Sequence, residues 1–95
     1  MTTYISLLRF TEQGSRNIRK SPDRARSFRE SVEARGVKVL AQYWTAGRCD
    51  GVLILQGKND IEVLRALADL ASEGNVQTES LRAFDAAEYA SLVGT

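Results

Sequence analysis

Hydrophobic residues along this chain change repeatedly from strand spacing to helix spacing, with glycine, proline and small polar residues between the segments. Alternating or continuous apolar runs predict strands, whereas apolar residues three and four positions apart predict helices. The pattern predicts a strand at 4–10, a helical turn at 15–20, a helix at 21–35, strands at 37–45 and 52–55, a helix at 60–73, a strand at 76–84 and a helix at 85–92.

Cap residues mark the expected helix ends. Ser21 before Pro22 is typical of an N-cap followed by the first helical residue, and Gly36 is expected to end that helix. The other end signals are Asn59 with Glu62 as a capping box, Gly74, and Asp85 as a cap. The stripes expected to face the core are Ala25, Phe28 and Val32 in the first long helix and Ile61, Leu64, Leu67, Ala68 and Ala71 in the second.

The order β-α-β-β-α-β predicts an α+β fold of the ferredoxin-like type, with a four-stranded antiparallel sheet and a short C-terminal helix. Two helices cover only one face of such a sheet. The first strand nevertheless carries Tyr4, Leu8 and Phe10 on one side and Ile5 and Leu7 on the other. In the second strand the expected faces are Val39, Ala41 and Tyr43 against Leu40, Gln42 and Trp44. An apolar open face predicts a homo-oligomer, a dimer or higher, in which two sheets pack as a dimeric α+β barrel.

Length and composition limit the classes of function. Ninety-five residues indicate one domain spanning 1–95, and the single cysteine excludes an intrachain disulfide framework. With no histidine, a Ser-His or Cys-His nucleophile pair within one chain is impossible. We expect no metal site, no cofactor, no membrane span, no leader peptide and a cytoplasmic location.

Charge is close to balanced overall, at +1, but it is unevenly spread. Residues 9–38 hold nine basic groups against four acids, which indicates a solvated helix face, head-to-tail complementarity or an anion near the first helix. Nucleic-acid binding is not expected, because the net charge is low and the third strand has no aromatic residue on which bases could stack.

The turn between the second and third strands carries the main candidate for chemistry. Asp50 follows Gly47 and precedes Gly51, so it is either a turn cap or a general base in a cleft. Arg82 is a candidate partner for a carboxylate ligand or for Asp50 itself. The full set of candidate ligand-binding residues is Tyr4, Thr11, Tyr43, Thr45 and Arg82, with Asp50 as the candidate catalytic residue.

Several short segments, taken in order, resemble the GYD domain family. They are Tyr4, Ile5 and Leu7; Thr11 and Gly14; Ser21, Pro22 and Arg24; Thr45, Gly47 and Asp50; Gly74, Asn75 and Val76; and Thr78 with Arg82, Ala83 and Phe84. The resemblance implies a dimeric ferredoxin-like fold and supplies no known reaction. Cys49 stands where the family's name leads one to expect tyrosine, so a phenol at that position is not available to a ligand.

Two functions from different classes are consistent with these features. The first is a small-ligand-binding protein or cofactor-free enzyme with a pocket between sheet and helices. The second is a structural or regulatory oligomerisation module without catalysis. A well-formed cavity lined by Tyr, Thr, Arg82 and Asp50 would favour the first, and a filled interior would favour the second.

Overall fold

The computed structural model describes residues 1–94, so residue 95 of the expected domain lies outside the described residues. The elements are β1 (Thr2–Phe10), α1 (Glu12–Arg16), a 3-10 turn η1 (Ile18–Lys20), α2 (Ser21–Glu33), β2 (Lys38–Trp44), β3 (Gly51–Gly57), α3 (Asp60–Ser72), β4 (Val76–Ala83) and α4 (Ala86–Val93).

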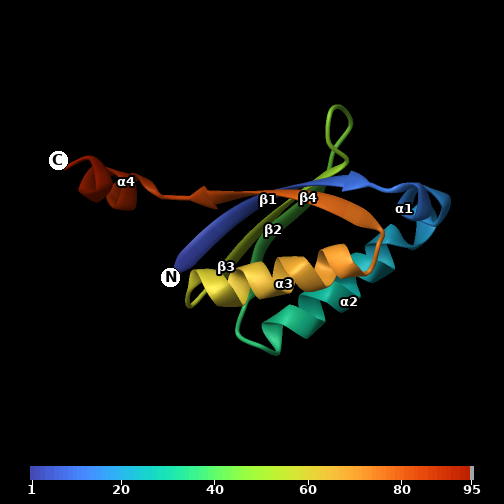
Figure 1. Ribbon diagram of the computed structural model, residues 1–95, viewed down its shortest axis with the longest axis horizontal. Coiled ribbons are helices and arrows are strands. Elements are labelled where there is room, and N and C mark those ends of the chain that lie inside the picture. Colours follow the sequence, from blue (N-terminus) through green and yellow to red (C-terminus); the bar gives the residue numbers. More distant parts are fainter. Residues whose placement is uncertain (95) are drawn as a thin grey trace.

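One antiparallel sheet organises the molecule. Its strand order is β2-β3-β1-β4, so the N-terminal strand lies inside the sheet with β3 and β4 on its two sides. Helices α2 and α3 cover one face, and no helix of residues 1–94 covers the other (Figure 1). This arrangement confirms the predicted α+β fold and its four-stranded antiparallel sheet.

The core lies between the sheet and the two long helices. Leu53 and Leu55 point from β3 toward the helices and are fully buried, as are Val32 of α2 and Val63 of α3. Burying a side chain of this size stabilises the fold by about 1.5–3 kcal/mol. The predicted first-helix stripe is confirmed at Val32 and Phe28, which both belong to this cluster.

The predicted stripe on the second long helix is wrong apart from Leu67, because Ile61 is 66% exposed and Leu64 is 44% exposed. The buried positions are Val63, Ala66 and Leu67, with Leu70 packed against them. Both helix faces carry apolar residues, so periodicity alone does not choose between them. The side that contains Val63 packs closely against β3, where a Cβ at Gly57 would lie only 2.7 Å from a methyl carbon of Val63.

The predicted faces of β2 hold for Ala41 with Tyr43 and for Gln42 with Trp44, but Val39 lies on the opposite face from Ala41 and Tyr43 because the strand contains a β-bulge. Its pairing with β3 shifts between Val39 and Ala41, which leaves Leu40 as the extra residue. An extra residue moves the following side chains to the other side of the sheet. Val39 is therefore buried under the helices, whereas Ala41 and Tyr43 lie on the open face.

The predicted N-caps agree with the structure at two of three helices. Ser21 is not an N-cap: α2 begins at Ser21 itself, Lys20 occupies the cap position, and the Ser21 hydroxyl accepts a hydrogen bond from the Trp44 indole N–H at 2.9 Å. Asn59 caps α3 by accepting from the Glu62 N–H, which is one of the two bonds of the predicted capping box, and Asp85 caps α4 within a reciprocal capping box. The Trp44 contact explains the difference, since it gives the serine hydroxyl a partner outside its own helix.

The C-terminal helix stands apart from the two layers. Figure 1 shows β4 running out beyond the sheet and carrying α4 at the far end of the molecule. None of the residues 86–93, all of which the structure describes, is buried. No helix within residues 1–94 is long and apolar enough to cross a membrane.

Candidate functional site

Polar groups from three turns meet at the end of the sheet where β1 finishes. The Thr11 hydroxyl donates to the Gly74 carbonyl at 2.6 Å and accepts from the Gly14 N–H at 3.1 Å. The Thr11 N–H donates to the Asn75 carbonyl at 3.1 Å. These bonds tie the start of α1 to the connection between α3 and β4.

Gly14 allows this close approach. It is buried, and a Cβ at its position would lie 2.0 Å from the Asn75 carbonyl oxygen. Gln13 closes the same junction from the solvent side, where its amide N–H donates to the Asn75 side chain at 2.9 Å. The polar groups of segments 11–14 and 74–75 therefore bond to each other and hold the two segments together.

Asp50 joins the β2–β3 turn (residues 45–50) to the same end of the sheet. Its carboxylate Oδ2 accepts a hydrogen bond from the Phe10 N–H at 2.8 Å, and its own N–H donates to the Leu8 carbonyl at 2.7 Å. Its carbonyl accepts from the Thr45 N–H at 2.9 Å, which closes the turn. The partner of the carboxylate thus lies on a neighbouring strand, not within the turn as the cap hypothesis expects.

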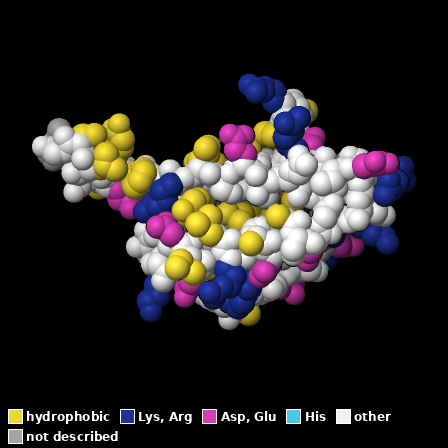
Figure 2. Space-filling view, viewed as in Figure 1, with side chains coloured by type: hydrophobic (Ala, Val, Ile, Leu, Met, Phe, Trp, Pro, Cys, Tyr) yellow, Lys and Arg dark blue, Asp and Glu magenta, His cyan; other side chains and the backbone are white. Residues whose placement is uncertain are grey.

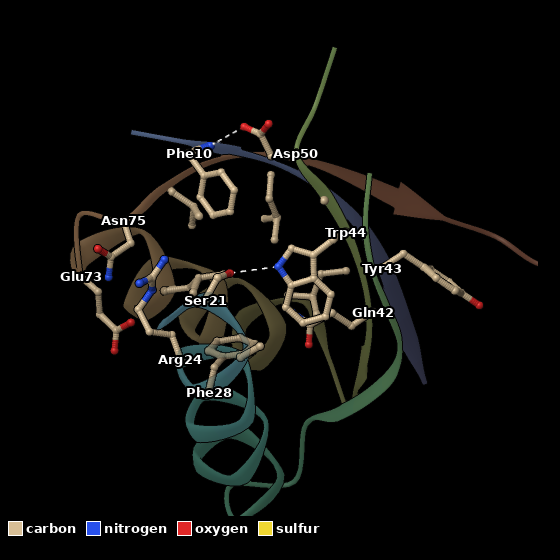
Figure 3. A pocket seen from close by; sticks show the side chains of 16 residues that line it. Phe10, Ser21, Arg24, Phe28, Gln42, Tyr43, Trp44, Asp50, Glu73 and Asn75 are labelled. Carbon is tan, nitrogen blue, oxygen red and sulfur yellow. Dashed lines mark hydrogen bonds between the residues drawn. The ribbon is translucent and has the colours of Figure 1, made fainter. Parts of the chain in front are cut away.

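An apolar cavity lies behind these groups, between the sheet and the helices. Its volume is about 50 Å³, and its lining includes Phe10, Phe28, Trp44, Asp50 and Leu53. In Figure 3 the Trp44–Ser21 and Asp50–Phe10 hydrogen bonds are drawn at this cavity, and Tyr43 points away from it. A space of that size holds a few water molecules, far less than the roughly 300–1,000 Å³ of a drug-sized site.

A second polar cluster lies at the opposite end of the sheet. The Tyr4 hydroxyl donates to the Asp60 carboxylate at 3.2 Å, and Arg82 pairs with the same carboxylate at 3.4 Å. Burial of the phenol is the main reason that the pKa of Tyr4 is raised above its ordinary value of 10.0; the nearby charge and hydrogen bond of Asp60 add to the increase, and Arg82 opposes it. Arg82 also stacks over the Phe84 ring at 4.5 Å.

The residues that the sequence proposed for one site are therefore distributed over three places. Thr11 and Asp50 lie at the turn end of the sheet, and Tyr4 and Arg82 lie at the other end. Arg82 pairs with Asp60, not with Asp50. Tyr43 lies on the open face, and the Thr45 hydroxyl donates to the Cys49 carbonyl within the turn at 2.7 Å.

Cys49, the residue in place of a tyrosine, is half-buried in the same turn. The Thr45 hydroxyl lies 3.6 Å from its sulfur as well as contacting its carbonyl. The backbone carbonyl provides the shorter of these two contacts. The Cys49 backbone carbonyl, more than its thiol, therefore holds the Thr45 side chain in the turn.

The open sheet face is not covered by any helix of residues 1–94. Strand pairing places on it the apolar side chains of Ile5, Leu7, Ala41, Tyr43, Val52, Ile54 and Leu81. Tyr43 is 63% exposed and Leu81 is 46% exposed. A contiguous apolar surface rimmed by polar residues is characteristic of a site where another macromolecule binds.

Sequence reasoning missed Asp60 and the Trp44–Ser21 contact. Asp60 is the first residue of α3, and only the pairing of β1 with β4 brings Tyr4 and Arg82 next to it. Ser21 precedes a proline, a pattern that predicts a helix N-cap and not a hydrogen bond to a tryptophan. Nothing in local spacing links it to a tryptophan of another element.

These features define a small α+β domain with one sheet face covered by helices and one left open. The chain belongs to the GYD domain family, whose model matches residues 4–93. It is 35% identical over 89 residues to a protein of Thermus thermophilus named glutamine synthetase and cystathionine beta-lyase binding protein, a match that covers 93% of this chain and 94% of that one. The crystal structure of TTHA0845 from Thermus thermophilus is similar, with a TM-score of 0.57 and 26% identity, over 90% of this chain and 96% of that one.

Proposed function

We propose that this chain is a non-catalytic binding protein, which assembles into a homodimer through its open sheet face and then recognises other proteins. The observation that carries the proposal is the apolar open face, on which Ile5, Ile54 and Leu81 lie side by side across three strands. Two ferredoxin-like sheets packed face to face would form a dimeric α+β barrel. Covering about 600 Å² of apolar surface per chain contributes on the order of 15 kcal/mol before association costs.

The interior supports a binding role over a catalytic one. Within residues 1–94, every buried side-chain nitrogen or oxygen has a hydrogen-bond partner within the protein. No buried polar group there is left to bind a substrate. The Asp50 carboxylate already accepts a backbone hydrogen bond, which is a structural use of that group. The cavity beside it is small, as a filled interior requires.

The relative from Thermus thermophilus supports protein partners, since its name describes binding to two enzymes. The match covers nearly the whole of both chains, so the relative's name refers to a protein of the same extent as this domain. By this proposal the first partners to test are a glutamine synthetase and a cystathionine beta-lyase from the same source as this chain.

Sedimentation velocity tests the self-association. We expect a dimer at micromolar concentration, and we expect Ile54→Lys to make it a monomer because a buried lysine would have no partner at the interface. The matched control is Ile61→Lys, at an exposed position on α3, which should leave the dimer intact. A wild-type protein that sediments as a monomer would overturn this part of the proposal.

Biolayer interferometry with the two purified enzymes tests the partner binding. Immobilised wild-type protein should bind at least one of them at micromolar concentration or below, and an unrelated oligomeric enzyme should not bind. Failure to bind either enzyme would overturn them as partners, whatever the oligomeric state of the chain.

A small-molecule ligand is the second candidate, favoured by the charged rim of the cavity. Arg24, Asp50 and Glu73 line the same apolar space, so a ligand with one apolar and one charged end would match its chemistry. Binding would require the cavity to enlarge. A thermal-shift screen of small metabolites checks this: a concentration-dependent increase in Tm that Phe28→Ala abolishes would support it, and no shift would contradict it.

A further inference from the structure

The C-terminal arm (residues 84–93) has the features of a segment that packs on another molecule. Tyr89 is 56% exposed, Leu92 59% and Val93 51%, although α4 is a fully formed helix with a capping box and a glycine at its end. Helices shorter than about 12–15 residues are marginal in water without packing. Figure 1 shows α4 apart from the two packed layers, where Tyr89, Leu92 and Val93 are exposed.

The apolar side chains of the arm follow helix spacing. Ala86, Tyr89, Ala90 and Val93 recur at i, i+3, i+4 and i+7, which places them along one side of α4. Figure 2 shows hydrophobic atoms gathered on this helix, away from the rest of the molecule. A stripe of this kind requires an apolar surface opposite it.

Two hollows of about 450 Å³ lie at the two ends of the sheet. The first, at the arm end, is lined by Met1, Thr3, Leu40, Gln56, Phe84 and Glu88. The second, at the turn end, is lined by Leu7, Arg9, Arg48, Cys49, Gln77 and Glu79. Because Thr3, Leu7 and Gln77 are open-face positions by strand pairing, both hollows border the open face.

The arm and the turn-end hollow carry opposite charge. Residues 84–93 contain the acids Asp85 and Glu88 and no basic residue. The turn-end hollow contains Arg9 and Arg48, both exposed, against the one acid Glu79. Figure 2 shows basic side chains at and beside the β2–β3 turn, which rises on the side of the sheet away from α2 and α3.

We infer that the arm of one copy lies across the turn end of a second copy, with its apolar stripe in the hollow beside Leu7 and its acids near Arg9 and Arg48. This inference rests on the homodimer proposed above. A two-fold axis that runs between the sheets, perpendicular to the strands, brings opposite ends together. The arrangement pairs acid with base twice, whereas an axis parallel to the strands would place the two acidic arms together.

The dimer dissociation constant tests the contribution of the arm. The full-length variant Tyr89→Ser with Val93→Ser retains the capping box and removes the two exposed large apolar side chains of the stripe. We expect its dimer Kd to rise on the order of tenfold or more, because those side chains lose their packing. Ile61→Ser with Leu64→Ser is the matched control, since it removes two similarly exposed side chains from α3 and should leave Kd unchanged.

Crosslinking tests where the arm lies, since Cys49 is the one cysteine of the chain. Leu92→Cys treated with a short bis-maleimide should give a covalent dimer that neither the wild type nor Leu92→Cys with Cys49→Ser gives. Ala68→Cys, on the exposed side of α3, should not crosslink to Cys49.

A dimer whose Kd is unaffected by the arm variant, or which gives no product specific to the two cysteines, would overturn the arm placement and leave the self-association intact. A wild-type monomer would instead overturn the proposed homodimer and the arm placement together.

Discussion

The Asp50 carboxylate accepts a hydrogen bond from the backbone N–H of Phe10, forty positions earlier in the chain and 2.8 Å away. This bond fastens the β2–β3 turn to the end of the neighbouring strand β1. The same strand end continues into Thr11, whose hydroxyl and N–H hold the α3–β4 connection. The turn end of the sheet is therefore one hydrogen-bonded unit built around the end of β1.

Substitution of Asp50 separates its structural use from a catalytic one. Asp50→Ala leaves the partly buried Phe10 N–H without its acceptor and should lower the free energy of unfolding by about 1–3 kcal/mol. Asp50→Asn retains an acceptor oxygen and should cost less than the alanine variant. Urea denaturation measures both values. If the Asn variant folds normally and keeps full function, the catalytic hypothesis for Asp50 is contradicted; a hundredfold or greater loss of function in a stable Asn variant would support it.

Gly14→Ala should be strongly destabilising, because the new methyl group would lie 2.0 Å from the Asn75 carbonyl oxygen. Forcing α1 away from that loop is an overpacking change, which typically costs about 1–3 kcal/mol or more. Ser15→Ala, at the exposed next position, is the control and should stay within about 0.5 kcal/mol of wild type. Equal thermal stability of the two variants would show that the junction adjusts easily.

Stability should fall at alkaline pH through Tyr4. The pKa of its phenol is raised in the folded state, chiefly by burial, so above about pH 10 the folded chain holds a proton that the unfolded chain has lost. The stabilisation from this group is complete below the unfolded pKa and is lost as pH rises through the folded pKa. Unfolding free energies measured from about pH 8 to 11 should decline less steeply in Tyr4→Phe. An unchanged slope in that variant would contradict the assignment to Tyr4.

Cys49→Ser should be nearly silent. The Thr45 hydroxyl donates to the Cys49 backbone carbonyl, which the substitution retains. We expect unfolding free energy within about 0.5 kcal/mol of wild type and a dimer Kd within a few-fold. A large loss of either would assign the thiol a role that the turn geometry does not require.

The helix caps and core stripes show which structural features local sequence patterns predict correctly. Asn59 and Asp85 act as caps, as their positions relative to each helix predict, because capping depends on groups three residues apart. The same kind of signal predicts a cap at Ser21, but its hydroxyl binds Trp44, which is 23 residues away along the chain. The predicted α3 stripe is wrong for a similar reason: both sides of the helix are apolar, and the side that packs on the sheet, next to Gly57, is the one that contains Val63.

Residue spacing and residue type are enough to specify the order of the four strands and the three longer helices, two of the N-caps, and the apolar residues on both faces of the first strand. They do not predict α1, which begins at Glu12 in a segment expected only to break the strand. The correctly predicted features are local, so the chain carries them before any long-range contact forms.

Which polar residues meet depends instead on the tertiary structure. Strand register brings Tyr4 next to Arg82 and places both at the opposite end of the sheet from Asp50. The bulge at Leu40 turns Tyr43 to the open face, and the sheet edge projects α4 away from the core. Register, bulges and the direction of a terminal arm depend on pairing between distant segments, so no local spacing specifies them.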